Sequence, residues 1–158
     1  MLKKKITIIL IILAILAVAV CVVCFGGKKG NVNGSLEDIM SKLYQGINED
    51  ELPMALGNIE LTDENIESFI GTTEVKYTEA IANESMVGSI AHSVVLLRVE
   101  EGSNVDEAVQ KIKENVNPRK WICVEASNVI VKNRGDLVVL IMSNETLAPK
   151  LEANFDNL

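Results

Sequence analysis

The chain has 158 residues, 48% of them apolar, and its 15 Lys and Arg are outnumbered by 22 Asp and Glu. Residues 1–30 carry five lysines and no acid, whereas residues 31–158 carry all 22 acids and ten basic residues, which gives net charges of +5 and −12. A body of 128 residues is one ordinary domain, so two large domains are excluded. Its acidity excludes an electrostatic nucleic-acid surface, which needs clustered Lys and Arg.

An uncharged apolar run, ITIILIILAILAVAVCVVCF, occupies residues 6–25. At about 1.5 Å per residue, a helix of this length crosses the roughly 30 Å hydrocarbon core of a bilayer, where the backbone has no water to bind. We therefore predict a cytoplasmic flank over residues 1–5, a transmembrane signal anchor over 6–25, a flexible Gly- and Asn-rich tether over 26–34 and an extracytoplasmic domain over 35–158.

The lysines around this run predict its orientation. Three lysines and the amino terminus precede the run and two lysines follow it, so the positive-inside rule predicts a single-pass protein of the cell membrane with a cytoplasmic N-terminus and an extracellular C-terminal domain. Two other fates of the leader stay open. Ala17 and Ala19 are small residues at the two positions that signal peptidase recognises, so the leader could be cleaved after Ala19. It could also be lipidated on a cysteine, although Cys21 and Cys24 each follow a valine and lipidation needs a small residue before the cysteine.

The body alternates between helical and strand-like apolar patterns. In chain order, we predict helices over 36–47 and 62–70, strands over 75–82 and 89–99, a helix over 105–116, strands over 129–132 and 137–142, and a helix over 145–158. We interpret 52–54 as a loop, and Asn133 to Asp136 as a hairpin turn. The strand at 89–99 is apolar on both faces, which is typical of a central strand.

The order of these elements predicts the fold class. Consecutive strands joined by short turns favour antiparallel pairing. We predict an α+β fold, in which an N-terminal transmembrane helix precedes a small two-layer domain with an antiparallel sheet of about four strands and helices packed on one face. Trp121 could be an exposed binding aromatic, but its neighbours Ile122 and Val124 predict a position in the core or at its rim.

A resemblance rests on the N-terminal anchor and on the segments LPM, AHSVVLLRV, VNPRKWICVEASNVIVKN and GDLVVLIMS. With these segments, the chain resembles a family of membrane-anchored or lipoprotein extracytoplasmic domains of unknown function from Gram-positive anaerobic bacteria. The similarity covers residues 35–145. The resemblance implies an exported bacterial domain, and it carries over no active-site residue.

His92 is the one histidine and the first residue to consider for catalysis. Strand alternation places it on a face with Val94 and Leu96 and sends Ser93 to the other face, so the strand itself supplies no nucleophile for a catalytic triad. We therefore expect a structural histidine and predict no catalytic, cofactor-binding or metal-binding residue.

Zinc and calcium are the two metal ions for which the sequence contains suitable ligand types. A zinc site needs three or four Cys and His ligands, and the body has His92 and Cys123 alone. Acids at 49–51 and 60–67 could supply oxygen ligands to calcium, but the calcium-loop pattern D-x-[DN]-x-[DN]-G is absent. Whether these acids bind calcium stays open, and no cofactor is predicted.

These observations favour a membrane-tethered extracytoplasmic domain that is not an enzyme. We expect a binding or interaction module at the bacterial cell envelope, held in the membrane by residues 6–25, with an envelope protein or a cell-wall component as partner and no nucleic acid. The alternative is a small envelope hydrolase or metal-assisted enzyme that uses His92 and nearby acids. A cleft placing His92 within about 3 Å of an acid or a hydroxyl would favour this alternative.

Overall fold

The computed structural model describes residues 30–158, and the predicted flank 1–5 and membrane anchor 6–25 lie outside the described residues. In chain order its elements are α2 (Leu36–Leu43), the 3-10 turn η1 (Glu49–Glu51), β1 (Leu56–Glu60), α3 (Ile66–Ile70), β2 (Tyr77–Ser85), β3 (Ser93–Val99), α4 (Val105–Asn115), β4 (Asn128–Arg134), β5 (Leu137–Ser143) and α5 (Leu147–Asp156). The five strands form one antiparallel sheet in the order β1-β2-β3-β5-β4. The predicted α+β class and antiparallel pairing are confirmed.

Strands β3 and β5 form the centre of this sheet and pair along their lengths, from Ser93 with Met142 to Arg98 with Leu137. All seven residues of β5 are buried, and in β3 only Arg98 is partly exposed. Successive side chains of a strand point to opposite faces of the sheet. A strand that is apolar along its whole length therefore needs cover on both faces.

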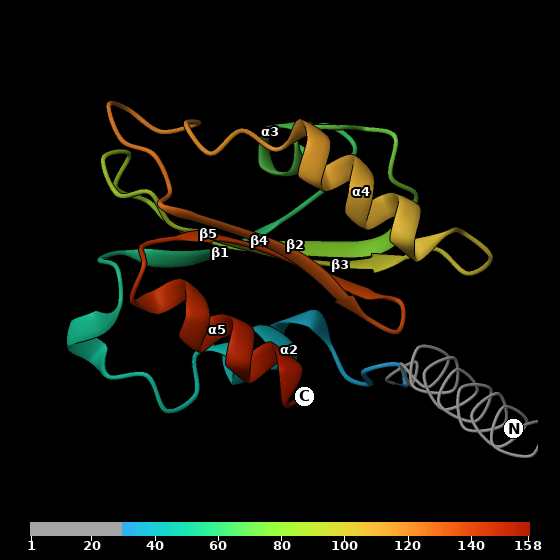
Figure 1. Ribbon diagram of the computed structural model, residues 1–158, viewed down its shortest axis with the longest axis horizontal. Helices are drawn as coiled ribbons and strands as arrows, with labels where there is room; N and C mark the ends of the chain where they lie inside the picture. Colours follow the sequence, from blue (N-terminus) through green and yellow to red (C-terminus); the bar gives the residue numbers. More distant parts are fainter. Residues whose placement is uncertain (1–29) are drawn as a thin grey trace, which may run out of the picture.

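Helices supply this cover on both faces, so the described domain has three layers (Figure 1). One face packs against α3 and α4, and the other face packs against α2 and α5. The central strands contribute alternate residues to the two cores: Val95, Leu97, Val138 and Leu140 on the α3/α4 face, and Val94, Leu96, Val139 and Ile141 on the α2/α5 face. The prediction of helices on one face was wrong, because it would have left half of these side chains in water.

The antiparallel sheet, predicted with about four strands, has five, because β1 adds a strand at its edge. It pairs with β2 from Leu56 opposite Ser85 to Glu60 opposite Ile81. The sequence LGNIE contains Gly57 and Asn58, which strands disfavour, and three of its five residues are only half-buried. An edge strand of this kind gives little periodic signal, and cross-strand hydrogen bonds rather than side-chain burial hold it in place.

The first and last helices pack side by side on one face of the sheet (Figure 1). Ser35 begins α2 by accepting a hydrogen bond from the backbone of Asp38 at 3.2 Å. Near the end of α5, the amide of Asn154 donates to the carbonyl oxygens of Leu43 at 2.7 Å and of Gln45 at 3.0 Å. Pro149 lies in the first turn of α5, where its missing N–H has no cost.

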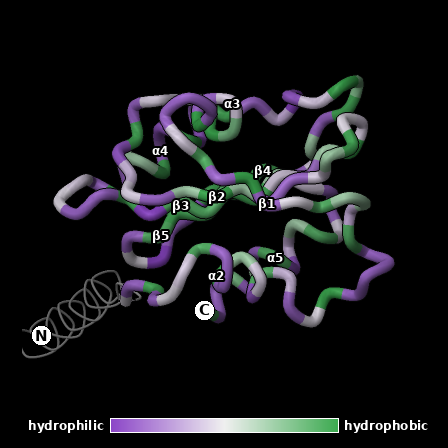
Figure 2. The backbone as a smooth tube through the Cα atoms, turned by 180° about the vertical axis from the view of Figure 1, so that it is seen from behind, coloured by the Kyte–Doolittle hydropathy of each residue, from purple (hydrophilic) through white to green (hydrophobic). Residues whose placement is uncertain are grey.

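The two ends of the sheet differ in what surrounds them. At one end of the sheet, which we call the tether end, Gly30 meets the 100–104 loop and the 135–136 hairpin turn. At the opposite end, which we call the tip, lie the loops 52–55, 86–92, 116–127 and 144–146. Strand β2 runs from Tyr77, paired with Val99 at the tether end, to Ser85 at the tip. In Figure 2 the hydrophobic colour concentrates on the strands between the helical layers and also appears on loops of the tip.

Gly71 ends α3 in a left-handed conformation at φ 81° and lies against the backbone of Asn115 at the end of α4. A methyl group there would meet the Asn115 carbonyl, so we expect Gly71→Ala to lower the free energy of unfolding by about 3 kcal/mol or more. Gly46→Ala is the matched control, because Gly46 has φ 75° but open space around it. It should cost about 1 kcal/mol in urea denaturation of residues 30–158. Equal losses would contradict this packing.

Candidate functional site

His92 lies one residue before β3 and is buried on the α2/α5 face, with 1% of its surface exposed. Its Nε2 is 2.7 Å from the hydroxyl of Tyr44, which follows α2, and its Nδ1 is 2.8 Å from Oγ of Ser143, the last residue of β5. The β3–β5 register explains the second contact. Ser93 is opposite Met142, so the next position places His92 opposite Ser143 on the same face.

Burial keeps the imidazole of His92 and the phenol of Tyr44 neutral. Desolvation lowers the pKa of His92 to about 4 and raises the pKa of Tyr44 above its usual value near 10. A phenol is a better donor than an aliphatic hydroxyl, so we assign the hydrogen bond from Tyr44 O–H to Nε2. The neutral imidazole then carries its proton on Nδ1, and this N–H donates a hydrogen bond to Oγ of Ser143. In this arrangement the imidazole takes no proton from the serine.

The chain Tyr44–His92–Ser143 meets one condition for a catalytic site and not the others. Two hydroxyls lie within 3 Å of His92, which is the distance that we required for the hydrolase alternative. Ser143, however, is 1% exposed, so a substrate atom has no path to its Oγ. The third member is a neutral phenol, where a triad uses a carboxylate to stabilise the imidazolium. The geometry therefore fits a satisfied polar group in the core.

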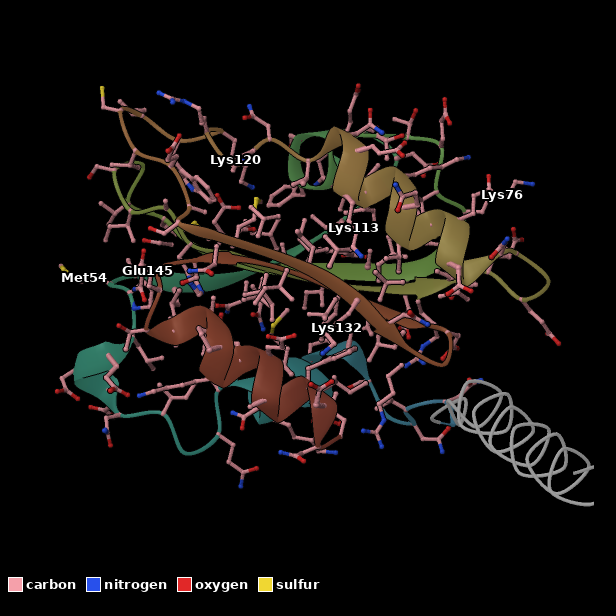
Figure 3. The ribbon with its side chains drawn as sticks, viewed as in Figure 1. Met54, Lys76, Lys113, Lys120, Lys132 and Glu145 are labelled. Carbon is pink, nitrogen blue, oxygen red and sulfur yellow. The ribbon has the colours of Figure 1, made fainter. Side chains whose placement is uncertain are left out.

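A second polar cluster lies on the α3/α4 face at the tip (Figure 3). Glu84, near the end of β2, accepts from Lys120 Nζ at 2.8 Å and from Trp121 Nε1 at 2.9 Å. Lys120 and Glu84 are each only 14% exposed, and the ammonium also lies 4.1 Å from the centre of the Phe69 ring. Burial lowers the pKa of Lys120 more than Glu84 raises it.

This cluster fastens the 116–127 loop to the sheet. Both carboxylate oxygens of Glu84 are occupied by protein donors, so the group is not free to bind a ligand. Trp121 packs at the margin of the α3/α4 core, as predicted. Sequence reasoning missed the cluster because the predicted strand ended at residue 82, whereas β2 continues to Ser85. A longer strand prediction would have placed Glu84 on the same face as Ala80 and Ala82.

The acidic segments do not converge on a metal site. Within residues 30–158 no group of three or more His, Cys, Asp and Glu is placed to hold a metal ion. Glu51 instead accepts from Lys150 at 2.7 Å, and this hydrogen bond is the main cause that lowers its pKa. Four acids, Glu100, Glu101, Asp106 and Asp136, line an open hollow of about 1000 Å³ at the tether end, together with Arg134.

Exposed apolar side chains gather on the loops of the tip. Met54, Met86 and Ile122 expose 72%, 58% and 71% of their surfaces. The three loops that carry them are joined, because the Met86 N–H donates to Ala55 at 3.0 Å and the Ile122 N–H donates to Gly88 at 2.9 Å. Cys123 follows Ile122 and is also exposed. No pattern in the sequence indicated this surface, since loops distant in the chain build it.

A comparison of the chain with known protein families, curated proteins and solved structures finds no match. The resemblance to membrane-anchored or lipoprotein domains of Gram-positive anaerobes therefore stays a prediction. Between residues 30 and 158, no helix is long and apolar enough to cross a membrane.

The pH dependence of stability tests the buried state of His92. The pKa of this side chain is about 4 in the folded domain and about 6.5 in an unfolded chain, so below pH 6.5 the unfolded state binds more protons. The contribution of the neutral, buried His92 to the free energy of unfolding is fully present above pH 6.5 and is lost as the pH falls toward 4. We expect a loss of about 2 kcal/mol between pH 7 and pH 4.5 in urea titrations of residues 30–158.

His92→Gln is the control for this measurement, because the amide hydrogen bonds without titrating in this range. The variant should lose about 2 kcal/mol less than the original chain over the same interval. The same slope in both proteins would show that the pKa of the histidine does not change on folding, as expected for a solvated side chain and not for a buried one.

Proposed function

We propose that this protein is a single-pass, membrane-tethered domain at the bacterial cell envelope that binds a partner and is not an enzyme. The uncharged run at 6–25 and the excess of lysines before it support an N-terminus in the cytoplasm and residues 35–158 outside. The net charge of −12 on residues 31–158 supports a body that stays off an anionic lipid surface.

The exposed apolar loops of the tip are the observation that carries the binding proposal. Monomeric domains rarely gather large exposed apolar side chains at one place, and where they do the surface usually meets a partner. Methionines suit such surfaces because their unbranched side chains adapt to different shapes. The one histidine of the chain and its serine neighbour, His92 and Ser143, are by contrast buried and hydrogen-bonded to each other.

A hydrolase remains the second candidate, favoured by the 2.8 Å contact between His92 and Ser143. A hydrolase would require the helical layer on this face, with Tyr44, to move away from the sheet, since His92 and Ser143 are both buried on the α2/α5 face. The packing of α2 through Ile39, Met40 and Leu43 opposes this movement. A binding module needs no such opening.

Cys123 allows the orientation to be tested with the native chain. It is exposed and is the one thiol of the described domain, while Cys21 and Cys24 lie within the proposed membrane span. A membrane-impermeant maleimide added to intact, wall-stripped cells should label the protein, and Cys123→Ser should abolish the label. Labelling that appears only after the membrane is permeabilised would place the domain in the cytoplasm.

A fluorophosphonate probe separates the two candidate functions, because it reacts with serines that a neighbouring base activates. We expect no reaction of the folded full-length protein, since Ser143 is inaccessible and its hydroxyl accepts a hydrogen bond from His92 instead of giving the imidazole its proton. Ser143→Ala is the matched control. Labelling of the original chain that disappears in both Ser143→Ala and His92→Gln would overturn the binding module in favour of the hydrolase.

A further inference from the structure

Arg98 fastens the beginning of the described chain to the tether end of the sheet. Its guanidinium donates to the carbonyl oxygens of Val32 at 3.0 Å and Gly34 at 3.2 Å, and it is held in place by Glu79 at 2.7 Å and Asp136 at 3.3 Å. Val32 itself is buried in the α2/α5 core. The described part of the segment that we predicted as a flexible tether therefore lies against the domain.

This attachment decides which end of the domain faces its own membrane. Four residues, 26–29, separate the proposed span from Gly30, and at about 3.5 Å each they reach roughly 15 Å. Strand β2, with nine residues, carries the chain about 30 Å from the tether end to the tip. The tip could reach its own bilayer only if the acidic domain lay flat against it, which anionic head groups would oppose.

Two occupants of the tip are disfavoured by this geometry. The lipid of the membrane that holds the anchor lies at the tether end, so it does not reach the tip. A second copy anchored in the same membrane presents its tip in the same direction, so the two tips cannot face each other. An occupant must therefore approach from outside, as a separate molecule.

The rim of the tip indicates the charge of this occupant. Glu49 and Asp50, in η1 directly before the Met54 loop, and Glu145, in the 144–146 loop, are exposed, and Figure 3 shows Glu145 and Met54 at the same end of the domain. Other charged residues near the tip form acid–base pairs, such as Arg119 with Glu125 at 2.9 Å and Lys120 with Glu84. The unbalanced charge at the rim is negative, so electrostatic complementarity favours a basic partner.

We infer that Met54, Met86 and Ile122 form a docking surface for an amphipathic protein segment, apolar on one face and flanked by Lys or Arg, that belongs to another envelope protein. This inference rests on the proposed function, because the membrane anchor sets the direction of the tip. The apolar side chains fill the apolar face of the segment, and the acids at the rim attract its basic flanks.

A designed helical peptide of Leu and Lys serves as the probe, with the full-length protein reconstituted in phosphatidylcholine vesicles. Trp121, the one tryptophan, lies next to Ile122 and reports binding through its fluorescence. We expect saturable binding that Ile122→Asp and Met86→Asp each weaken at least tenfold. Gln110→Asp is the matched control, because it adds the same charge on α4, away from the tip, and should leave the affinity unchanged.

Three outcomes would overturn the inference. Equal binding by the tip variants and Gln110→Asp would place the peptide elsewhere. Equal binding of a peptide with Ser in place of Leu would show that charge alone attracts it. Disulfide-linked dimers formed through Cys123 between copies in one membrane would identify a second copy as the occupant. Maleimide labelling of Cys123 remains the separate test of the proposed topology, so a failure there is distinguishable from a failure at the tip.

Discussion

The pairing of β3 with β5 is the interaction around which the domain is built. Both strands bury side chains on two faces, so the fold requires a helical layer above the sheet and another below it. Polar contacts close this apolar centre at both ends. Arg98 binds the entering chain at the tether end, and His92 with Ser143 closes the end near the tip. The arrangement separates an end tied to the incoming chain from an end built of four loops.

The sequence predicted most elements of the domain but not their arrangement in space. Helix α4 and strands β4 and β5 are close to their predicted ranges, because their apolar residues repeat with clear periods and their ends carry an Asn cap, a Pro and a two-residue turn. Helix α2 ends at Leu43, earlier than predicted, because the chain turns through Gly46 at φ 75°. The number of helical layers was mispredicted although the two-faced strand at 89–99 already contained the evidence for two.

The candidate site shows where single-sequence reasoning stops. Alternation within one strand correctly sends Ser93 away from the face of His92, yet it says nothing about the residue on the neighbouring strand. Ser143 is 51 positions away in the chain and Tyr44 is 48, and both contacts depend on the sheet register and on the placement of α2. The same limit applies to the tip. The loops that carry Met54, Met86 and Ile122 are distant in the chain and are joined at one end of the sheet only by backbone hydrogen bonds of the folded domain.

The packing of α2 against α5 has a consequence for how the protein is made. These helices are the first and last of the domain, and the contact from Asn154 to Leu43 joins residues 111 positions apart. Since a chain is synthesised from its N-terminus, α2 alone covers the α2/α5 face of the central sheet until α5 emerges. Closing so long a loop is also slow. A chain truncated before α5 would expose the apolar face of β3 and β5, and quality-control proteases could recognise that face as the mark of an unfinished molecule.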